Sequence, residues 1–204
     1  GGKRVSYGAR AITEGGYQSI PKLSFPGGLI LGCSAGLVNV PRIKGNHNAM
    51  ISGITAAEIA CEAIKEGLQN TELNNYDKEI RDGKVGSDLK PVKNVKPLWS
   101  RFGLLASLII GGIDMWIANI AGINLFGTLK HGKSDAKSTK PAKRFKEIEY
   151  PKPDGKFSFD RLTNVSFSGT NHEETQPCHL FLKNKNIPIR KNLPLFAEQA
   201  QRYC

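Results

Sequence analysis

The sequence predicts an α/β (α+β) fold, because strand-like and helix-like patterns follow one another along the chain. Three stretches carry this prediction. A short apolar run at residues 29–31 leads into a glycine-rich turn and then into a helical pattern. Residues 102–126 form a long apolar stretch, and residues 157–182 contain several short strand-like runs.

The most informative stretch, residues 25–50, is typical of a strand, a glycine turn, a loop and the start of a helix. The strand is expected to end at Gly32. The residues that follow are all small, so that a bulky group could approach the backbone there. They are Cys33, Ser34, Ala35 and Gly36.

A helix is predicted to follow this loop and to run to about Leu68, with Gly67 as its end. Asn46 is a candidate for its N-cap. Unpaired N–H groups at such a helix start favour an anion or an electron-accepting ring, whereas a strand–turn–helix unit without a ligand is the alternative. The small and apolar residues at helical spacing are Ala49, Gly53, Ala56, Ala57, Ala60, Cys61 and Ile64.

Composition and charge limit the possible function classes. The 204 residues, of which 39% are hydrophobic, suffice for one large or two small domains with a real core. The net charge of +11 suits nucleic acid, an anionic membrane surface or an acidic protein. No zinc-finger pattern or basic recognition helix is present, and the lysines are scattered through predicted loops, which argues against nucleic acid.

Cysteine usage and the chain ends suggest a reducing compartment and a longer parent protein. The four cysteines, at positions 33, 61, 178 and 204, form no CxxC pair and no disulfide framework. The chain starts without Met and stops at Cys204, so we interpret it as a segment of something longer. No signal-peptide pattern is visible within it.

The middle of the chain predicts an exposed helix and a membrane-facing segment. Residues 72–81 favour a helix that stops at Gly83, and the basic residues 90–96 form either a connector or a docking strip for acidic groups. Residues 102–126 are long enough to cross a bilayer, but their polar and glycine residues favour interfacial, monotopic insertion instead. Trp116 has a ring suited to headgroup depth. Flanking basic residues agree: Arg101, Lys130, His131 and Lys133. A glycine-kinked core helix is the alternative.

The last third of the chain predicts a linker and a strand-rich module. Residues 132–144 are polar and lysine-rich, as in a linker. A Pro-Asp-Gly turn at residues 153–155 precedes short strands, which are expected at 157–159, 162–168 and 178–182. His172 and Glu173 lie in a loop without metal-binding spacing.

Several long and idiosyncratic motifs resemble one family across essentially the whole chain. The matching stretches are GGKRVSYGARAITEGGYQSIPKLSFPGG, LGCSAGLVNVPRIKGNHNAM, TLKHGKSDAKSTKPAKRF, IEYPKPDG, SFD, SGTNHEETQPCHL and QRYC. The chain is similar in these stretches to the internal and C-terminal part of electron transfer flavoprotein–ubiquinone oxidoreductase. The apolar stretch agrees in position and character.

The resemblance implies four parts. Residues 1–68 would be the C-terminal part of an FAD-binding domain, and residues 69–131 a helical, membrane-surface segment that gives quinone access. Residues 132–147 would be a linker, and residues 148–204 the start of a truncated, β-rich iron-sulfur module of ferredoxin-like type.

The resemblance also implies site residues. Gly32, Cys33, Ser34, Ala35 and Gly36 would line the ribityl and pyrophosphate region of FAD. Related flavoproteins often carry Asp where Cys33 stands, which leaves the ribityl contact to Ser34 or to backbone.

Gly45, Asn46 and His47 would face the pyrimidine edge of the flavin ring. A helix start at this edge would stabilise negative charge on the reduced ring. Cys204 would be the first ligand of a 4Fe-4S cluster whose other three cysteines lie downstream. The N-terminal GxGxxG fingerprint is also expected outside this chain, so the segment alone should neither assemble a cluster nor hold FAD firmly.

The implied activity is that of an electron-transferring-flavoprotein dehydrogenase. Electrons from reduced electron transfer flavoprotein would pass through FAD and the cluster to ubiquinone, without a catalytic acid–base residue. The location would be the matrix face of the mitochondrial inner membrane, or the cytoplasmic face of a bacterial inner membrane. Two alternatives remain, namely an FAD-dependent reductase of the geranylgeranyl-reductase type and a non-catalytic basic membrane-surface binding protein.

Overall fold

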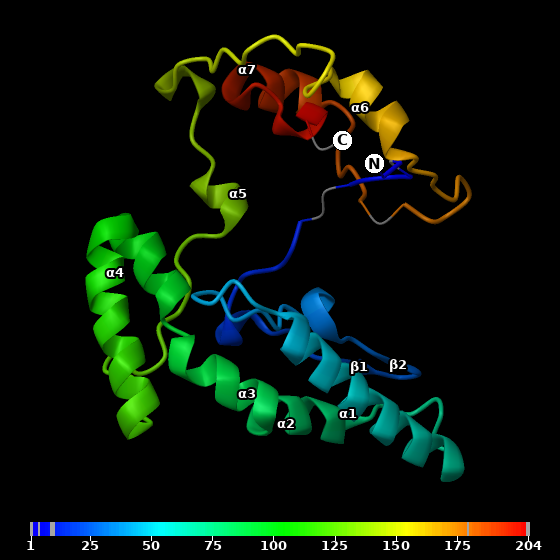
Figure 1. Cartoon of the computed structure of the whole chain (residues 1–204), viewed down its shortest axis with the longest axis vertical. Coiled ribbons are helices and arrows are strands. Elements are labelled where there is room, and N and C mark those ends of the chain that lie inside the picture. The colour runs from blue at the N-terminus through cyan, green and yellow to red at the C-terminus, as the bar shows by residue number, and fades with distance from the viewer. Residues whose placement is uncertain (1, 4, 9–10, 179, 203–204) are drawn as a thin grey trace. The chain divides into compact units, whose positions relative to one another are not determined.

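The computed structural model describes residues 2–3, 5–8, 11–178 and 180–202 (Figure 1). The chain forms two compact units. One unit consists of residues Ala11–Gly132, and the other combines Gly1–Arg10 with Lys133–Cys204. The described residues are mostly helical with one small sheet, rather than an even mixture of strands and helices.

The Ala11–Gly132 unit holds the sheet and the longest helices. Its sheet is an antiparallel pair in which Ser24 lies opposite Leu29 and Phe25 opposite Gly28. In order, its elements are η1 (Tyr17–Ser19), β1 (Ser24–Phe25), β2 (Gly28–Leu29), η2 (Gly32–Ala35), α1 (Asn46–Lys65), α2 (Asn74–Asp82), α3 (Lys84–Leu89), η3 (Lys90–Val92) and α4 (Val95–Ala121). The predicted strand at residues 29–31 is therefore wrong in extent, because the chain turns into η2 at Gly32 soon after β2 ends.

The helix predictions in this unit are largely confirmed. Helix α1 begins three residues before Ala49 and ends at Lys65, where Gly67 adopts φ +74° and the Leu68 N–H donates to the Ala63 carbonyl. Asn46 is its first residue and not its cap, because Gly45 holds the N-cap position. Helix α2 ends just before Gly83, as expected.

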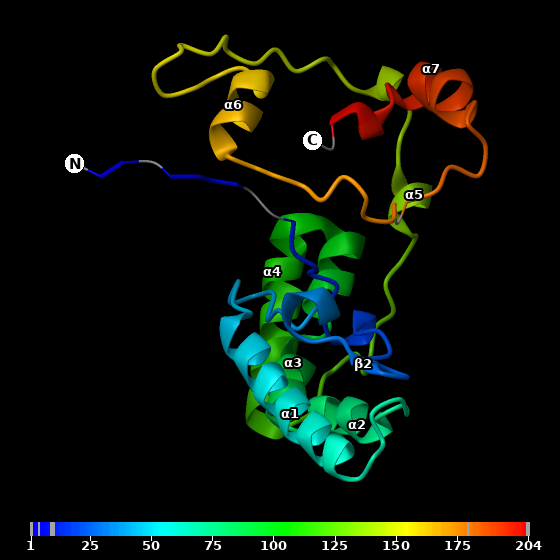
Figure 2. The ribbon, with the colours of Figure 1, turned by 90° about the vertical axis from the view of Figure 1, so that its right-hand side faces the viewer.

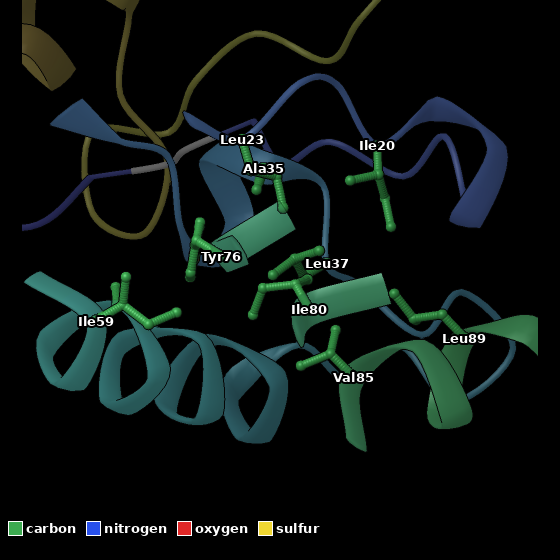
Figure 3. Close-up of a cluster of buried hydrophobic side chains, with 10 residues drawn as sticks. Ile20, Leu23, Ala35, Leu37, Ile59, Tyr76, Ile80, Val85 and Leu89 are labelled. Atoms are coloured by element: carbon green, nitrogen blue, oxygen red, sulfur yellow. The ribbon is translucent and has the colours of Figure 1, made fainter. Parts of the chain in front are cut away.

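The hydrophobic core lies where η2, α1, α2 and α3 meet (Figure 3). Tyr76 of α2 is completely buried, and its hydroxyl donates to the carbonyls of Ile30 (3.2 Å) and Ser52 (3.4 Å). Burial raises the pKa of Tyr76 to about 12. The buried cluster contains Ile20, Leu23, Ala35, Leu37, Ala56, Ile59, Tyr76, Ile80, Val85 and Leu89.

Two carboxylates attach the loops of this unit to its helices. Asp77 of α2 accepts from the Leu23 N–H (2.6 Å) and from Arg81 (2.6 Å). Asp88 of α3 accepts hydrogen bonds from several side chains between Asn39 and Asn48. Burial raises the pKa of Asp88, but hydrogen bonds from Asn39, Asn48 and His47 outweigh burial and hold the pKa below its ordinary value of 3.8.

The second unit contains short helices, and its described residues include no strand. A helix, α6 (Arg161–Ser168), occupies the predicted strand at 162–168. Asp160 caps it by accepting from the Thr163 N–H (3.1 Å), and Gly169 ends it at φ +67°. The other elements are α5 (Asp135–Ser138), η4 (Ala142–Arg144), η5 (Pro188–Asn192), α7 (Leu193–Phe196) and η6 (Gln199–Arg202).

Local contacts hold α6 and the turn before it. The Tyr7 hydroxyl reaches the carbonyl of Asn164 (2.9 Å), and the rings of Phe159 and Phe167 meet edge to face at 5.2 Å. The predicted turn at residues 153–155 is confirmed, since three backbone N–H groups donate to the Asp154 carboxylate. Those bonds, the one from Ser158 foremost, lower the pKa of Asp154 to about 2.

Replacing Tyr76 by Phe tests the buried hydroxyl. We expect Tyr76→Phe to lower the free energy of unfolding by about 1 kcal/mol, because the carbonyl oxygens lose a buried donor. Urea unfolding measures the change. Tyr150→Phe, at a side chain that is 72% exposed, is the control. Equal midpoints for the two variants would contradict this account.

Acid should remove the contribution of Asp88 to stability. Because the folded pKa of Asp88 is depressed, its contribution is present above pH 3.8 and is lost as the pH falls through the lower folded pKa. We expect Asp88→Asn to be less stable than the parent by about 1–3 kcal/mol at pH 7. This gap should close at the acid end of an unfolding series. A gap that stays constant down to the lowest pH would show that the charge contributes nothing.

Candidate functional site

The glycine turn and the start of α1 lie against each other. The Gly32 N–H donates to the Ser52 hydroxyl (3.0 Å), and a Cβ at Gly32 would lie 3.4 Å from that of Ala49. Gly32 therefore packs against the first two turns of α1, the helix that carries Asn46 and His47 at its start (Figure 2). Because the Gly32 N–H is already bonded to Ser52, it is not available to a ligand.

The turn itself has an inner and an outer side. Gly32, Ala35 and Gly36 are buried, whereas Cys33 and Ser34 are exposed. Gly36 adopts φ +74°, which closes the 3-10 helix η2 and favours glycine. Of the five predicted turn residues, Cys33 and Ser34 are thus the two whose side chains face solvent.

The loop between the turn and α1 is a closed hairpin. The Asn39 N–H donates to the Lys44 carbonyl (2.8 Å), and the Lys44 N–H returns a bond to Asn39 (3.3 Å). Ile43 stands at φ +51°, which is strained for a β-branched residue. A Cβ at Gly45 would come within 3.1 Å of the Val38 Cγ2, so a larger residue here would require the Val38 side chain to shift by a few tenths of an ångström.

The start of α1 has no side-chain cap. Gly45 offers no capping side chain, so the first N–H groups of this 20-residue helix are not capped by one. A cavity of about 600 Å³ lies at this helix start, lined by Arg42, Ile43, Lys44, Gly45, Asn46 and His47. Basic side chains and the positive helix end make the cavity suitable for an anionic or electron-rich group. A flavin's pyrimidine edge has this character, so the residues present fit that cofactor.

Asp88 lies beneath this loop and joins its parts. Its Oδ2 accepts from Asn39, Asn48 and His47, each at 3.0 Å, and its Oδ1 accepts from Arg42 at 3.1 Å. The carboxylate therefore balances the positive charge of Arg42 at the edge of the cavity. Sequence reasoning overlooked Asp88, because no motif marks a single acid on a short helix.

A second cavity connects the loop with α4. Its volume is about 580 Å³. Asn39 and Arg42 line one side, and Met115, Trp116 and Ile120 of α4 line another. Polar groups at the loop and apolar groups at the helix thus border one space. Local sequence patterns treat the two stretches separately, whereas the resemblance implies that the apolar stretch gives quinone access to the flavin.

The predicted metal ligand cannot be placed. Cys204 lies outside the described residues. Within the described part of the chain, no group of three His, Cys, Asp or Glu side chains could hold a metal ion. The thiols of Cys33, Cys61 and Cys178 are all exposed.

Comparison with known proteins gives the same family as the sequence motifs. Residues 155–204 match the family model described as "Electron transfer flavoprotein-ubiquinone oxidoreductase, 4Fe-4S". A mitochondrial electron transfer flavoprotein-ubiquinone oxidoreductase of Caenorhabditis elegans is 50% identical over the whole chain, which covers 34% of that relative. The human protein is 48% identical with 34% of its length covered, and that of Arabidopsis thaliana 46% with 31% covered.

The chain thus spans about a third of the length of the curated relatives that it matches. The identity extends from one end of the chain to the other and includes the part that matches the iron-sulfur family model. The resemblance inferred from the motifs is therefore confirmed: throughout its length, the chain is similar to a part of electron transfer flavoprotein–ubiquinone oxidoreductase.

Proposed function

We propose that this chain is the part of a membrane-associated oxidoreductase that brings FAD close to ubiquinone. The enzyme would pass electrons from reduced electron transfer flavoprotein through FAD and a 4Fe-4S cluster to ubiquinone. The observation that carries the proposal is the cavity shared by the loop before α1 and the apolar helix α4. The names of the relatives agree with this chemistry and favour neither the geranylgeranyl-reductase type nor a non-catalytic protein.

The flavin would be held by backbone and small side chains. Cys33 and Ser34 would lie beside the ribityl and pyrophosphate groups, in front of the buried Gly32, Ala35 and Gly36. Gly45, Asn46 and His47 would meet the pyrimidine edge at the uncapped helix start. FAD, when bound, would supply the exchange of single electrons and electron pairs, and the helix dipole would stabilise added negative charge.

Helix α4 has the opposite distribution of polar and apolar side chains from a helix surrounded by water. After the kink at Gly103, its protein-facing positions are small or polar, namely Ser107, Gly111, Asp114 and Ala118, which are all buried. Apart from Asn119, the exposed face of this part is apolar. The large exposed side chains are Leu104, Leu105, Leu108, Ile109, Ile113, Trp116 and Ile120. This reversal supports contact with lipid acyl chains.

The geometry of α4 favours insertion from one side over a crossing. By length and composition alone, the helical run Lys84–Ala121 could cross a membrane. Gly103 interrupts it with φ +72°, however, and the part after the kink has one side packed on the protein. Asp114 there is 2% exposed and accepts from Asn94 (3.1 Å) and Asn124 (3.0 Å). A helix anchored on one side in this way suits a monotopic protein.

The remaining parts of the proposal follow the relatives. These relatives are named as mitochondrial proteins. We therefore assign the chain to mitochondria, and more finely to the matrix face of the inner membrane. Cys204 would be the first of four cluster ligands, an assignment that the match of residues 155–204 supports. Electron transfer flavoprotein would be the protein partner. No side chain of this chain would act as an acid or base.

The visible spectrum of the complete protein tests the cofactors. We expect the full reading frame, purified in detergent, to show flavin bands together with the paramagnetic signal of a reduced 4Fe-4S cluster. Cys204→Ser should abolish the cluster signal and leave the flavin bands, and Cys178→Ser should leave both, because Cys178 lies outside the proposed ligand set. If the parent contains flavin without iron, the geranylgeranyl-reductase type is favoured. If it contains neither cofactor, a non-catalytic protein is favoured.

Charges on α4 should weaken membrane binding. Leu105 and Ile109 are 78% and 67% exposed. We expect Leu105→Glu with Ile109→Glu in the complete protein to lower partitioning into phosphatidylcholine–cardiolipin vesicles by at least about 100-fold, since each charge opposes insertion by a few kcal/mol. Vesicle sedimentation measures this. The matched pair Ile148→Glu with Ile189→Glu, also exposed, should bind as the parent does. Unchanged binding of the α4 variant would contradict insertion.

A further inference from the structure

Four side chains from the loop before α1 and from its first turn bond to one carboxylate. Asn39 and Arg42 come from the closed loop, and His47 and Asn48 from the first turn of α1. All four direct an N–H group at Asp88, with distances of 3.0–3.1 Å. A single residue of α3 therefore joins the loop to the helix start.

The four N–H groups that converge on position 88 require a side chain that accepts hydrogen bonds and donates none. A carboxylate only accepts, and Asp88 takes three donors at Oδ2 and one at Oδ1, whereas an amide has one oxygen and adds an NH₂ group. The two asparagines show how strong this demand is. Both turn their NH₂ toward Asp88 although their own Oδ1 atoms are buried without a hydrogen-bond partner among the described residues.

Asp88 also stands on a rigid support. Its neighbours in α3, Val85 and Leu89, are both 1% exposed and belong to the hydrophobic core. The side chain of Asp88 itself is 16% exposed. Core packing thus fixes where the carboxylate lies, and the carboxylate fixes where the loop lies.

We propose that Asp88 is the positioning residue of the flavin-facing loop: its carboxylate holds Arg42, His47 and the uncapped start of α1 in the arrangement that meets the flavin. Asp88 acts through these groups and does not contact the flavin. This inference rests on the proposed function, because it assumes that flavin binds at the helix start. It adds a residue from outside the glycine turn and the helix start to the determinants of flavin binding.

The experiment compares Asp88 with Asp77 in the complete protein. Asp77 is a matched control, since it is also a partly buried carboxylate that ties a loop to a helix, through Leu23 and Arg81. We would prepare Asp88→Asn, Asp88→Ser and Asp88→Glu beside Asp77→Asn and Asp77→Ser. Two quantities are measured for each variant: the dissociation constant of FAD, by fluorescence titration of the deflavinated protein, and the thermal unfolding midpoint.

We expect Asp88→Asn to bind FAD about tenfold more weakly, as for the loss of hydrogen bonds to a charged group. Asp77→Asn should bind FAD like the parent, although its unfolding midpoint should be similar to that of Asp88→Asn. Hydrogen exchange of residues 39–48 should speed up in the Asp88 variants and not in the Asp77 variants. If Asp88→Asn does not fold, the Ser and Glu variants provide the same comparison.

Two outcomes are separable. If FAD affinity follows the unfolding midpoint along one line for both positions, or if the Asp88 variants bind FAD like the parent, the positioning role is overturned. If the parent itself binds no flavin, the proposed function fails instead.

Discussion

An open helix start inside an otherwise well-bonded unit is the constraint on which the rest of this structure depends. The first N–H groups of α1 are not capped by a side chain, which costs stability unless another group meets them. The surroundings offset this cost. Ser52 bonds the turn to the helix, Asp88 gathers the loop, and the core around Tyr76 lies behind both. These bonds surround the helix start and leave its first N–H groups as a place where a ligand could accept hydrogen bonds.

In helix α4, too, polar groups are bonded within the protein. Polar groups in this helix face the protein, where Asn94 and Asn124 satisfy one oxygen of Asp114. Asn94 also bonds the Gly127 carbonyl (3.0 Å) and the Leu129 N–H (2.9 Å), so the chain after α4 is held to its beginning. The polar interactions of Asp114 are therefore internal, and the outward face is largely apolar, as the proposed contact with lipid would require.

Sequence patterns predicted the helices better than the strands, for physical reasons. Small residues at helical spacing identified α1, and Gly83 marked the end of α2, because both signals are local. The run 162–168 was expected to form a short strand. Asp160 and Gly169 cap a helix there instead. Asp88 could not be found from sequence, since its role arises from packing that joins residues about forty to fifty positions apart.

The two cavities share Arg42 as a wall, which would link the proposed flavin site to α4. Arg42 lines both cavities, and Asp88, which bonds Arg42, lines the one that reaches Trp116. A shift of α4 relative to α3 would change the shared cavity and the support of the loop together. In the proposed enzyme, the depth of α4 in lipid and the position of the loop that meets flavin would then not be independent variables. Such coupling suits an enzyme whose electron acceptor would arrive from the membrane, because the path from flavin to acceptor must stay short wherever the bilayer holds the helix.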